Sequence, residues 1–144
     1  MKTYVSIHLV CEDAGKHLLI RRAGSPYFPG YLSLVAGHVE AGETPVEALV
    51  REVAEEIGVT LRPRDLNFRN VVYRRLPDRI YVDYFFGTED LPASPRIVEH
   101  DKITELGYFD IADHRDEIVP YVFMALSHPD LYLEFDETGR PAGT

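Results

Sequence analysis

The sequence has little of several features that define other classes of protein. Its 144 residues contain one cysteine, Cys11, so no intramolecular disulfide can form, and this usage suits a reducing cytoplasm. Lys and Arg number 15 against 24 Asp and Glu, a formal net charge of −9. Because contacts with a long nucleic acid need clustered basic side chains, we expect no such partner. No apolar run approaches the roughly 18 residues of a transmembrane helix, so we also expect no membrane partner.

Signals of a second domain or of export are also missing. We find no internal repeat and no low-complexity linker, and the N-terminal residues lack the pattern of a secretory signal peptide. A hydrophobic content of 45% with 27% charged residues is ordinary for a folded globular protein. We therefore expect one domain over residues 1–144, cytoplasmic and either monomeric or homodimeric, with a mobile polar tail from Thr138.

Segments rich in β-forming residues, separated by turn residues, predict most of a β-sheet. The predicted strands cover residues 3–11, 17–23, 31–36, 66–75, 80–87 and 103–110, with a short edge strand at residues 131–133. Apolar residues at helical spacing predict a helix over residues 116–127, in which Pro120 is tolerated near the start. With the helix described next, this order predicts an α/β fold, an α/β/α sandwich around a mixed β-sheet.

The best-marked helix of the sequence begins after Thr44. Thr44 is followed by Pro45 and, three residues on, by Glu47, which is a capping box with proline at the first helical position. Gly58 supplies a C-terminal stop. One apolar stripe, expected to pack on a core, is formed by Val46, Leu49, Val50, Val53 and Ile57.

A second stripe of the same helix is acidic. Glu52, Glu55 and Glu56 fall together, roughly 120° round from the apolar stripe, and Arg51 is the local cation. Like charges at this spacing repel each other by a few tenths of a kcal/mol per pair, which suggests a missing cation. Oxygen-only ligands favour hard divalent ions such as Mg²⁺, which also bind substrate phosphates. A solvated acidic face is the alternative.

The full spacing of residues 37–59 favours a metal site over a solvated acidic face. Gly37, then Glu43, then Arg51 with the three glutamates and Gly58, reproduces the pattern G-x5-E-x7-R-E-U-x-E-E-x-G-U, where U is aliphatic. Seven fixed residue types coincide by chance roughly once in 10⁸ starting positions. This segment resembles the Nudix box, and the chain is similar to Nudix hydrolases. Just upstream, residues 32–36 read LSLVA where the family usually has W-x-x-P-G.

The resemblance implies roles for the residues of the box. It implies hydrolysis of a nucleoside diphosphate linked to another group, assisted by Mg²⁺ or Mn²⁺. A further carboxylate often comes from the downstream loop, where Glu99 is the candidate and a plain loop charge the alternative. The implied metal ligands are Gly37 through its carbonyl, Glu52, Glu55, Glu56 and Glu99; the implied catalytic residues are Glu52 as a general base, Glu55, and Arg51, which orients the glutamates and pairs with Glu43.

Four residues outside the box are candidates for binding substrate. Tyr27 and Phe28 could stack on a base, or could instead close the edge of the core. Arg22, at a predicted strand end, could reach phosphate, although a solvated arginine there is common. Asp83 could accept hydrogen bonds from a nucleobase, or be an ordinary surface aspartate.

The resemblance leaves the substrate open. Short loops favour a nucleoside triphosphate, cleaved to a monophosphate and pyrophosphate. The alternatives are ADP-ribose or another nucleotide sugar or dinucleotide, for which Pro77 downstream of the box is a weak sign, and a non-catalytic module that binds a nucleotide. Such modules usually lose box carboxylates, whereas this chain keeps them all.

Overall fold

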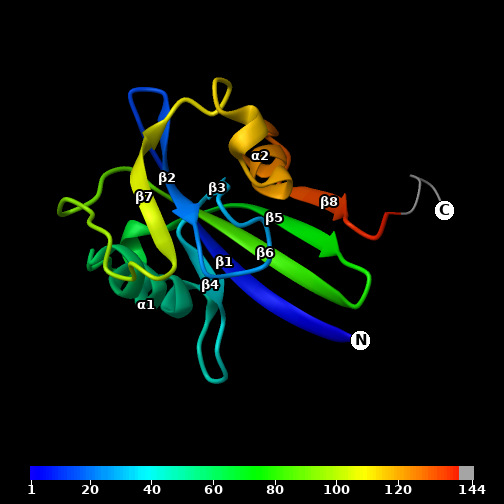
Figure 1. The fold of residues 1–144 in the computed structure, drawn as a ribbon. Coiled ribbons are helices and arrows are strands. Elements are labelled where there is room, and N and C mark those ends of the chain that lie inside the picture. Colours follow the sequence, from blue (N-terminus) through cyan, green and yellow to red (C-terminus); the bar gives the residue numbers. More distant parts are fainter. Residues whose placement is uncertain (140–144) are drawn as a thin grey trace.

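The computed structural model describes residues 1–139, which form a mixed β-sheet with helices packed against it (Figure 1). The mobile tail expected from Thr138 falls mainly on residues 140–144, which lie outside the described residues. The elements are β1 (Lys2–Asp13), β2 (Lys16–Arg22), β3 (Leu32–Ser33), β4 (Ala36–His38), α1 (Pro45–Ile57), the 3₁₀ helix η1 (Pro63–Asp65), β5 (Asn67–Arg75), β6 (Arg79–Thr88), β7 (Ile103–Phe109), the 3₁₀ helix η2 (Arg115–Glu117), α2 (Pro120–Ser127) and β8 (Tyr132–Asp136).

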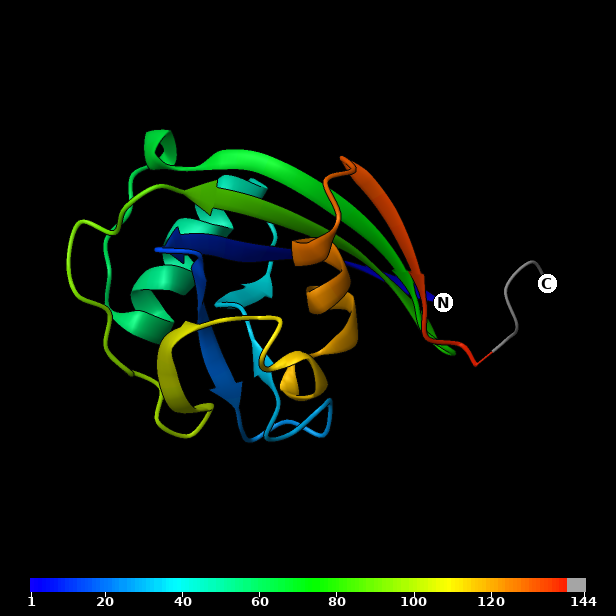
Figure 2. The same cartoon turned by 90° about the horizontal axis from the view of Figure 1, so that it is seen from above.

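The sheet is mixed because strands distant in the sequence pair in both directions. Its main path runs β3-β2-β1-β6-β5-β8, with β4 added on β1 and β7 on β2. β1 runs parallel to β6 and β5 parallel to β8, whereas the β5–β6 pair is antiparallel. Figure 2 shows β5, β6 and β8 curving side by side. The long parallel β1–β6 pairing holds the N-terminal strand in the middle of the sheet.

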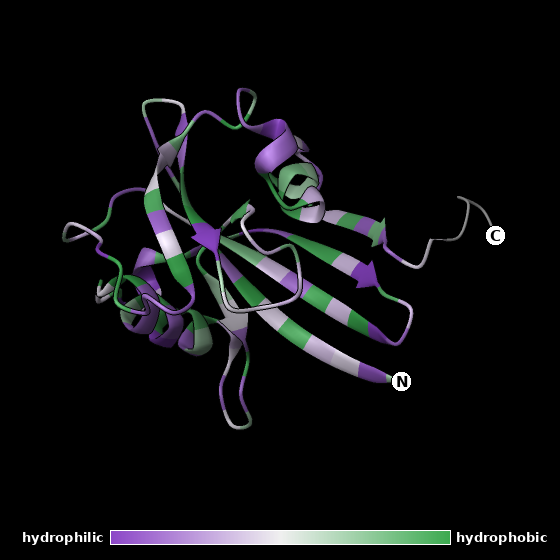
Figure 3. Ribbon diagram, viewed as in Figure 1, coloured by the Kyte–Doolittle hydropathy of each residue, from purple (hydrophilic) through white to green (hydrophobic). Residues whose placement is uncertain are grey.

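Alternation along the strands divides the buried side chains between two layers, and Figure 3 shows the alternation along the central strands. Ile7 and Leu9 of β1 pack with Leu49 and Val53 of α1. Val10, the next residue of β1, faces the opposite cluster, which contains α2. The expected α/β/α sandwich is therefore confirmed. No helix within residues 1–139 is long and apolar enough to cross a membrane.

Element boundaries differ from the sequence prediction in three places. The strand expected at residues 31–36 is split into β3 and β4, which pair with different strands. α2 begins at Pro120 rather than at residue 116, because proline has no N–H to donate and is suited to the first helical position. The edge strand expected at 131–133 runs as β8 to Asp136, since it pairs along β5.

The predicted capping of α1 is present in full. The Thr44 hydroxyl accepts a hydrogen bond from the backbone N–H of Glu47 at 3.1 Å, and the Glu47 carboxylate accepts one from the Thr44 N–H at 2.9 Å. Gly58 ends the helix with φ 68°, a left-handed conformation that favours glycine. The helix that carries the acidic stripe is thus fixed at both ends.

The cap gives a first testable prediction. Thr44→Ala should lower the free energy of unfolding by about 1 kcal/mol, because the Glu47 N–H loses its acceptor. Thr44→Ser keeps the hydroxyl and should stay within a few tenths of a kcal/mol of the native protein. Urea denaturation followed by circular dichroism measures both. Equal stability of the two variants would show that the cap contributes nothing.

Candidate active site

Arg51 is the centre of the acidic cluster on α1. Its Nε donates to Glu43 Oε2 at 2.7 Å and its Nη2 to Glu43 Oε1 at 3.0 Å. Its Nη1 donates to Glu52 at 2.8 Å and to Glu55 at 3.3 Å. A further bond from Nη2 reaches the His38 carbonyl at 3.1 Å. One guanidinium therefore ties the helix to the preceding loop and fixes two of the three glutamates, and the bond to Arg51 holds the pKa of Glu43 at about 2.

Gly37 brings the backbone of β4 against the Glu52 carboxylate. A Cβ built on Gly37 would lie 2.2 Å from Glu52 Cδ and 2.4 Å from Oε1, far inside van der Waals contact. Gly37 is opposite Ile7 of β1, so the sheet fixes its position. A side chain at position 37 would force the Glu52 carboxylate to move, so glycine permits this close approach.

Glu56 is the most buried member of the acidic stripe. It is 8% exposed, and its Oε2 accepts a hydrogen bond from the Ala36 N–H at 3.3 Å. Within residues 1–139 it has no ion-pair partner. Burial raises the pKa of Glu56 to about 8, and the neighbouring charge of Glu52 adds to the effect. Burial also raises the pKa of Glu52.

Glu99 lies close enough to this cluster to act on it electrostatically. The Val98 N–H donates to the Glu56 carbonyl at 3.0 Å, which holds the downstream loop against the end of α1. The charge of Glu99 contributes to the raised pKa of both Glu52 and Glu56. Lys102 Nζ is 3.5 Å from Glu99 Oε2 and gives it a partial counter-charge. Metal binding by Glu99 stays a prediction.

These residues fit a hard divalent cation. The donors are oxygens only, one carboxylate is buried without a cationic partner, and another is pressed against the carbonyl-bearing Gly37. In the arrangement described for residues 1–139, no three acidic, His or Cys side chains converge on one point, and Arg51 holds Glu52 and Glu55. A cation would therefore compete with Arg51 for those two carboxylates.

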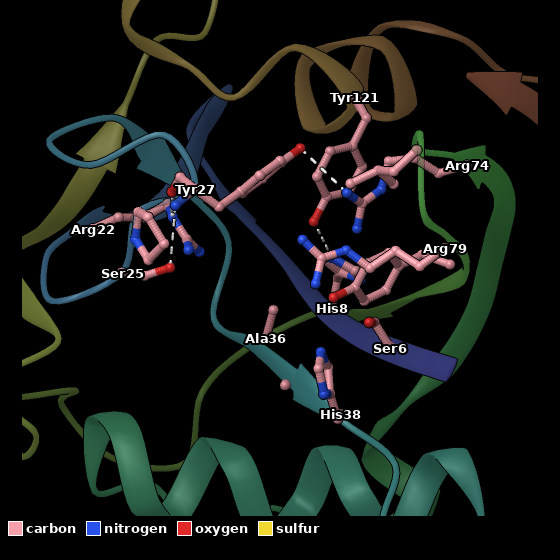
Figure 4. A pocket seen from close by; sticks show the side chains of 14 residues that line it. Ser6, His8, Arg22, Ser25, Tyr27, Ala36, His38, Arg74, Arg79 and Tyr121 are labelled. Atoms are coloured by element: carbon pink, nitrogen blue, oxygen red, sulfur yellow. Dashed lines mark hydrogen bonds between the residues drawn. The ribbon is translucent and has the colours of Figure 1, made fainter. Parts of the chain in front are cut away.

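A cavity of about 380 Å³ opens beside Gly37, on the side of the sheet that faces α2 (Figure 4). Of the residues predicted to bind substrate, Arg22 and Tyr27 line it, whereas Phe28 and Asp83 do not. Its lining residues are Ser6, His8, Arg22, Ser25, Pro26, Tyr27, Ala36, Gly37, His38, Arg74, Leu76, Arg79, Tyr81 and Tyr121.

Asp83 and Phe28 have other surroundings. Asp83 is 0% exposed, and Arg74 donates to its two oxygens from Nε at 2.8 Å and Nη2 at 3.3 Å. In place of the expected contact with a nucleobase, Asp83 therefore holds a guanidinium. Phe28 packs edge-on against Tyr27 and Tyr31 at the margin of the core, the alternative considered for it from the sequence.

Several lining residues carried no signal in the sequence. Arg74 stacks over Tyr121 at 3.9 Å from its centroid and over Tyr81 at 4.3 Å. His8 Nδ1 lies 3.2 Å from the Tyr84 carbonyl, which can only accept, so His8 Nε2 accepts from the Tyr121 hydroxyl at 2.8 Å. Burial lowers the pKa of His8 to about 4, so it is neutral at pH 7. These residues meet through pairing between strands, and the spacing of residues along a single strand does not reveal which strands pair.

Comparison with known proteins gives one family. The NUDIX domain family model matches residues 1–126. The chain is 28% identical over 94 residues to the 8-oxo-dGTP diphosphatase of Escherichia coli K12, covering 65% of this chain and 71% of that protein. It is 42% identical over 62 residues to the ADP-ribose pyrophosphatase of Methanocaldococcus jannaschii, covering 43% of this chain and 36% of that protein. The crystal structure of MutT NUDIX hydrolase from Burkholderia pseudomallei matches with a TM-score of 0.75 and 27% identity, covering 86% of this chain and 95% of that one.

The raised pKa of Glu56 predicts a pH-dependent stability in EDTA. The pKa of the Glu56 carboxyl is about 8 in the folded protein and therefore higher than in the unfolded chain. Below about pH 4 the carboxyl is protonated in both states and does not change the free energy of unfolding. Between about pH 4 and pH 8 it lowers the free energy of unfolding increasingly, because only the unfolded chain readily loses the proton. Glu56→Gln removes this cost, so it should raise the free energy of unfolding by on the order of a few kcal/mol at pH 8.5 and hardly at pH 4.5. Glu55→Gln, at a side chain 49% exposed, is the control and should give a smaller gain than Glu56→Gln at pH 8.5. The same gain for Glu56→Gln at both pH values would contradict the account.

Proposed function

Because this chain belongs to the Nudix hydrolase family, we propose that it hydrolyses a nucleoside triphosphate to a nucleoside monophosphate and pyrophosphate. The observation that supports the proposal most is the braced acidic cluster. Arg51 holds Glu52 and Glu55 at 2.8 and 3.3 Å, and Gly37 opens onto a cavity beside them. Gly37 therefore lies between the carboxylates of α1 and a cavity large enough for a small ligand.

Nudix hydrolases generally need divalent metal ions, and here Gly37, Glu52, Glu55, Glu56 and Glu99 would hold Mg²⁺ or Mn²⁺. When bound, such an ion neutralises charge on phosphoryl oxygens and makes water more acidic. The chain itself places the carboxylates of Glu52 and Glu56, both with a raised pKa, on one face of α1. Arg51 orients Glu52, and burial raises the pKa of Glu52, so this carboxylate can accept the proton of an attacking water.

Two substrate classes compete within the family. The bacterial relative named as an 8-oxo-dGTP diphosphatase aligns over 71% of its length, and the archaeal relative named as an ADP-ribose pyrophosphatase over 36%. The broader match favours a triphosphate. The cavity of about 380 Å³ lies in the range of small-ligand pockets, towards its lower end. ADP-ribose and dinucleotides are the alternative substrates, and the carboxylates that non-catalytic modules usually lose are all present.

The catalytic assignment predicts that Glu52→Gln folds normally and loses turnover by about 10²- to 10⁴-fold, the usual cost of removing a general base. Glu56→Gln should fold at least as stably as the native protein in EDTA and also lose most activity. Release of pyrophosphate from pooled nucleoside triphosphates with Mg²⁺ or Mn²⁺ measures turnover, and circular dichroism controls for folding. Near-native turnover of both variants would refute the mechanism.

The choice of substrate predicts an order of specificity constants. We expect kcat/KM to be higher for at least one nucleoside triphosphate, oxidised bases included, than for ADP-ribose or diadenosine polyphosphates. Products separated by ion-exchange chromatography should be the monophosphate and pyrophosphate. A kcat/KM for ADP-ribose well above that of every triphosphate would reject the triphosphate proposal and leave the family assignment intact.

A further inference from the structure

We propose that this protein forms a dimer through an apolar area of the sheet that α1 leaves uncovered, and that the partner is a second copy of the same chain. The proposal does not depend on the proposed catalytic function. The apolar area, called the open face below, consists mainly of side chains from β5 and β6: Phe68, Val71, Tyr73, Ile80, Val82 and Tyr84. Val5 of β1 and Tyr132 of β8 extend it on either side.

The pairing of the strands places these side chains on one face of the sheet. In the antiparallel β5–β6 pair, Val71 is opposite Tyr84 and Tyr73 is opposite Val82. The same register continues into β1 on one side and into β8 on the other. The Phe68 ring joins the group, with its centroid 6.4 Å from that of Tyr84. Because side chains alternate along each strand, the residues between these point to the opposite face.

The helix α1 covers only the other half of this face. Beneath α1, the core takes Ile7 from β1 and Phe86 from β6, and Tyr84 packs at its margin. Apart from Tyr84, the residues of the open face belong to neither core cluster described for residues 1–139. In Figure 1, the halves of β1, β6 and β5 nearest the N-terminus lie clear of both helices. The open face is therefore accessible to a partner.

The exposed apolar area of the open face is close to what a dimer interface needs. Phe68 is 50% exposed and Tyr132 is 55% exposed. Half of an aromatic side chain is about 100 Å², so these two and the six half-buried residues together present roughly 400 Å². A standard interface takes about 800 Å² from each partner, and a little over half of that area is apolar. The open face thus supplies the apolar centre of one interface.

The charges on the protein favour the open face over other surfaces for contact between two copies. Arg75 and Asp136, beside the open face, pair at 2.6 Å, and Glu134 accepts a hydrogen bond from the Tyr132 hydroxyl. At the far ends of β1 and β6, by contrast, a cavity of about 440 Å³ is lined by four carboxylates, those of Glu12, Asp13, Glu89 and Asp90. Two copies of a chain with net charge −9 repel each other strongly at such a surface and least at the open face.

A dimer formed in this way leaves the cavity beside Gly37 open in both copies. A two-fold axis would bury the same residues of each chain, and the two sheets would pack face to face about 10 Å apart. Ser6, Arg74 and Tyr81 alternate with the residues of the open face and line the cavity on the opposite side of the sheet. The dimer therefore supports the strands that carry these residues without covering the cavity.

Sedimentation equilibrium from about 1 µM to about 200 µM protein, in EDTA, tests the proposal. We expect the native protein to change from a species of 16.4 kDa to one of twice that mass as the concentration rises. Phe68→Arg and Tyr132→Arg place a charge on the open face and should each weaken the dimer at least about 10-fold. Tyr108→Arg, the same change at a tyrosine of β7 that is 37% exposed, is the matched control and should dimerise as the native protein does.

Three results would overturn the proposal, provided that circular dichroism shows each variant to be folded. The first is a native protein that stays monomeric over the whole concentration range. The second is a dimer that neither Phe68→Arg nor Tyr132→Arg weakens, which would place the interface on another surface. The third is a monomer that sediments with phosphatidylcholine vesicles and loses this binding in both variants, which would identify a lipid surface as the occupant.

Discussion

Crowding of negative charge on one side of α1 is the constraint on which the rest of the site depends. Glu52, Glu55 and Glu56 lie within one turn of helix, and burial of Glu56 raises its pKa to about 8. Arg51 offsets part of this repulsion, since it bonds Glu43, Glu52 and Glu55 at once. A helix fixed by a capping box and a C-terminal glycine keeps these carboxylates together although their charges repel.

The β-sheet helps to form the site because its strands bring segments that are distant in the sequence next to one another. β1 pairs with β4 on one side and with β6 on the other, so Gly37 and the strand that carries Asp83 are both positioned by it. The Glu52 carboxylate lies against Gly37 because that position has no side chain. On the other side of Gly37, Arg74 is held by Asp83 and Tyr27. Gly37 therefore contacts Glu52 and also lines the cavity that contains Arg74.

The sequence predicted both ends of α1 from local spacing, and it predicted the α/β/α sandwich from the order of its strands and helices. For Asp83, the sequence suggested either a contact with a nucleobase or a place on the surface, whereas the structure buries it against Arg74. Its partner could not be predicted, since Arg74 reaches Asp83 diagonally across a register set by the whole hairpin, in which Arg74 is opposite Tyr81. The bonds of Tyr27 to Arg74 and Glu137 join segments 47 and 110 residues apart, which no local pattern encodes.

The central claim is that Gly37 and the glutamates of α1 form one divalent-cation site, and titration with Mn²⁺ followed by electron paramagnetic resonance tests it most directly. The native protein should bind Mn²⁺, and Gly37→Ala, in which a Cβ would lie 2.2 Å from Glu52 Cδ, should stay folded and bind it at least about 10-fold more weakly. Gly107→Ala, where the nearest atom to the new Cβ is 3.6 Å away, is the control and should bind Mn²⁺ as the native protein does. Equal Mn²⁺ affinity in Gly37→Ala and the native protein would contradict the account.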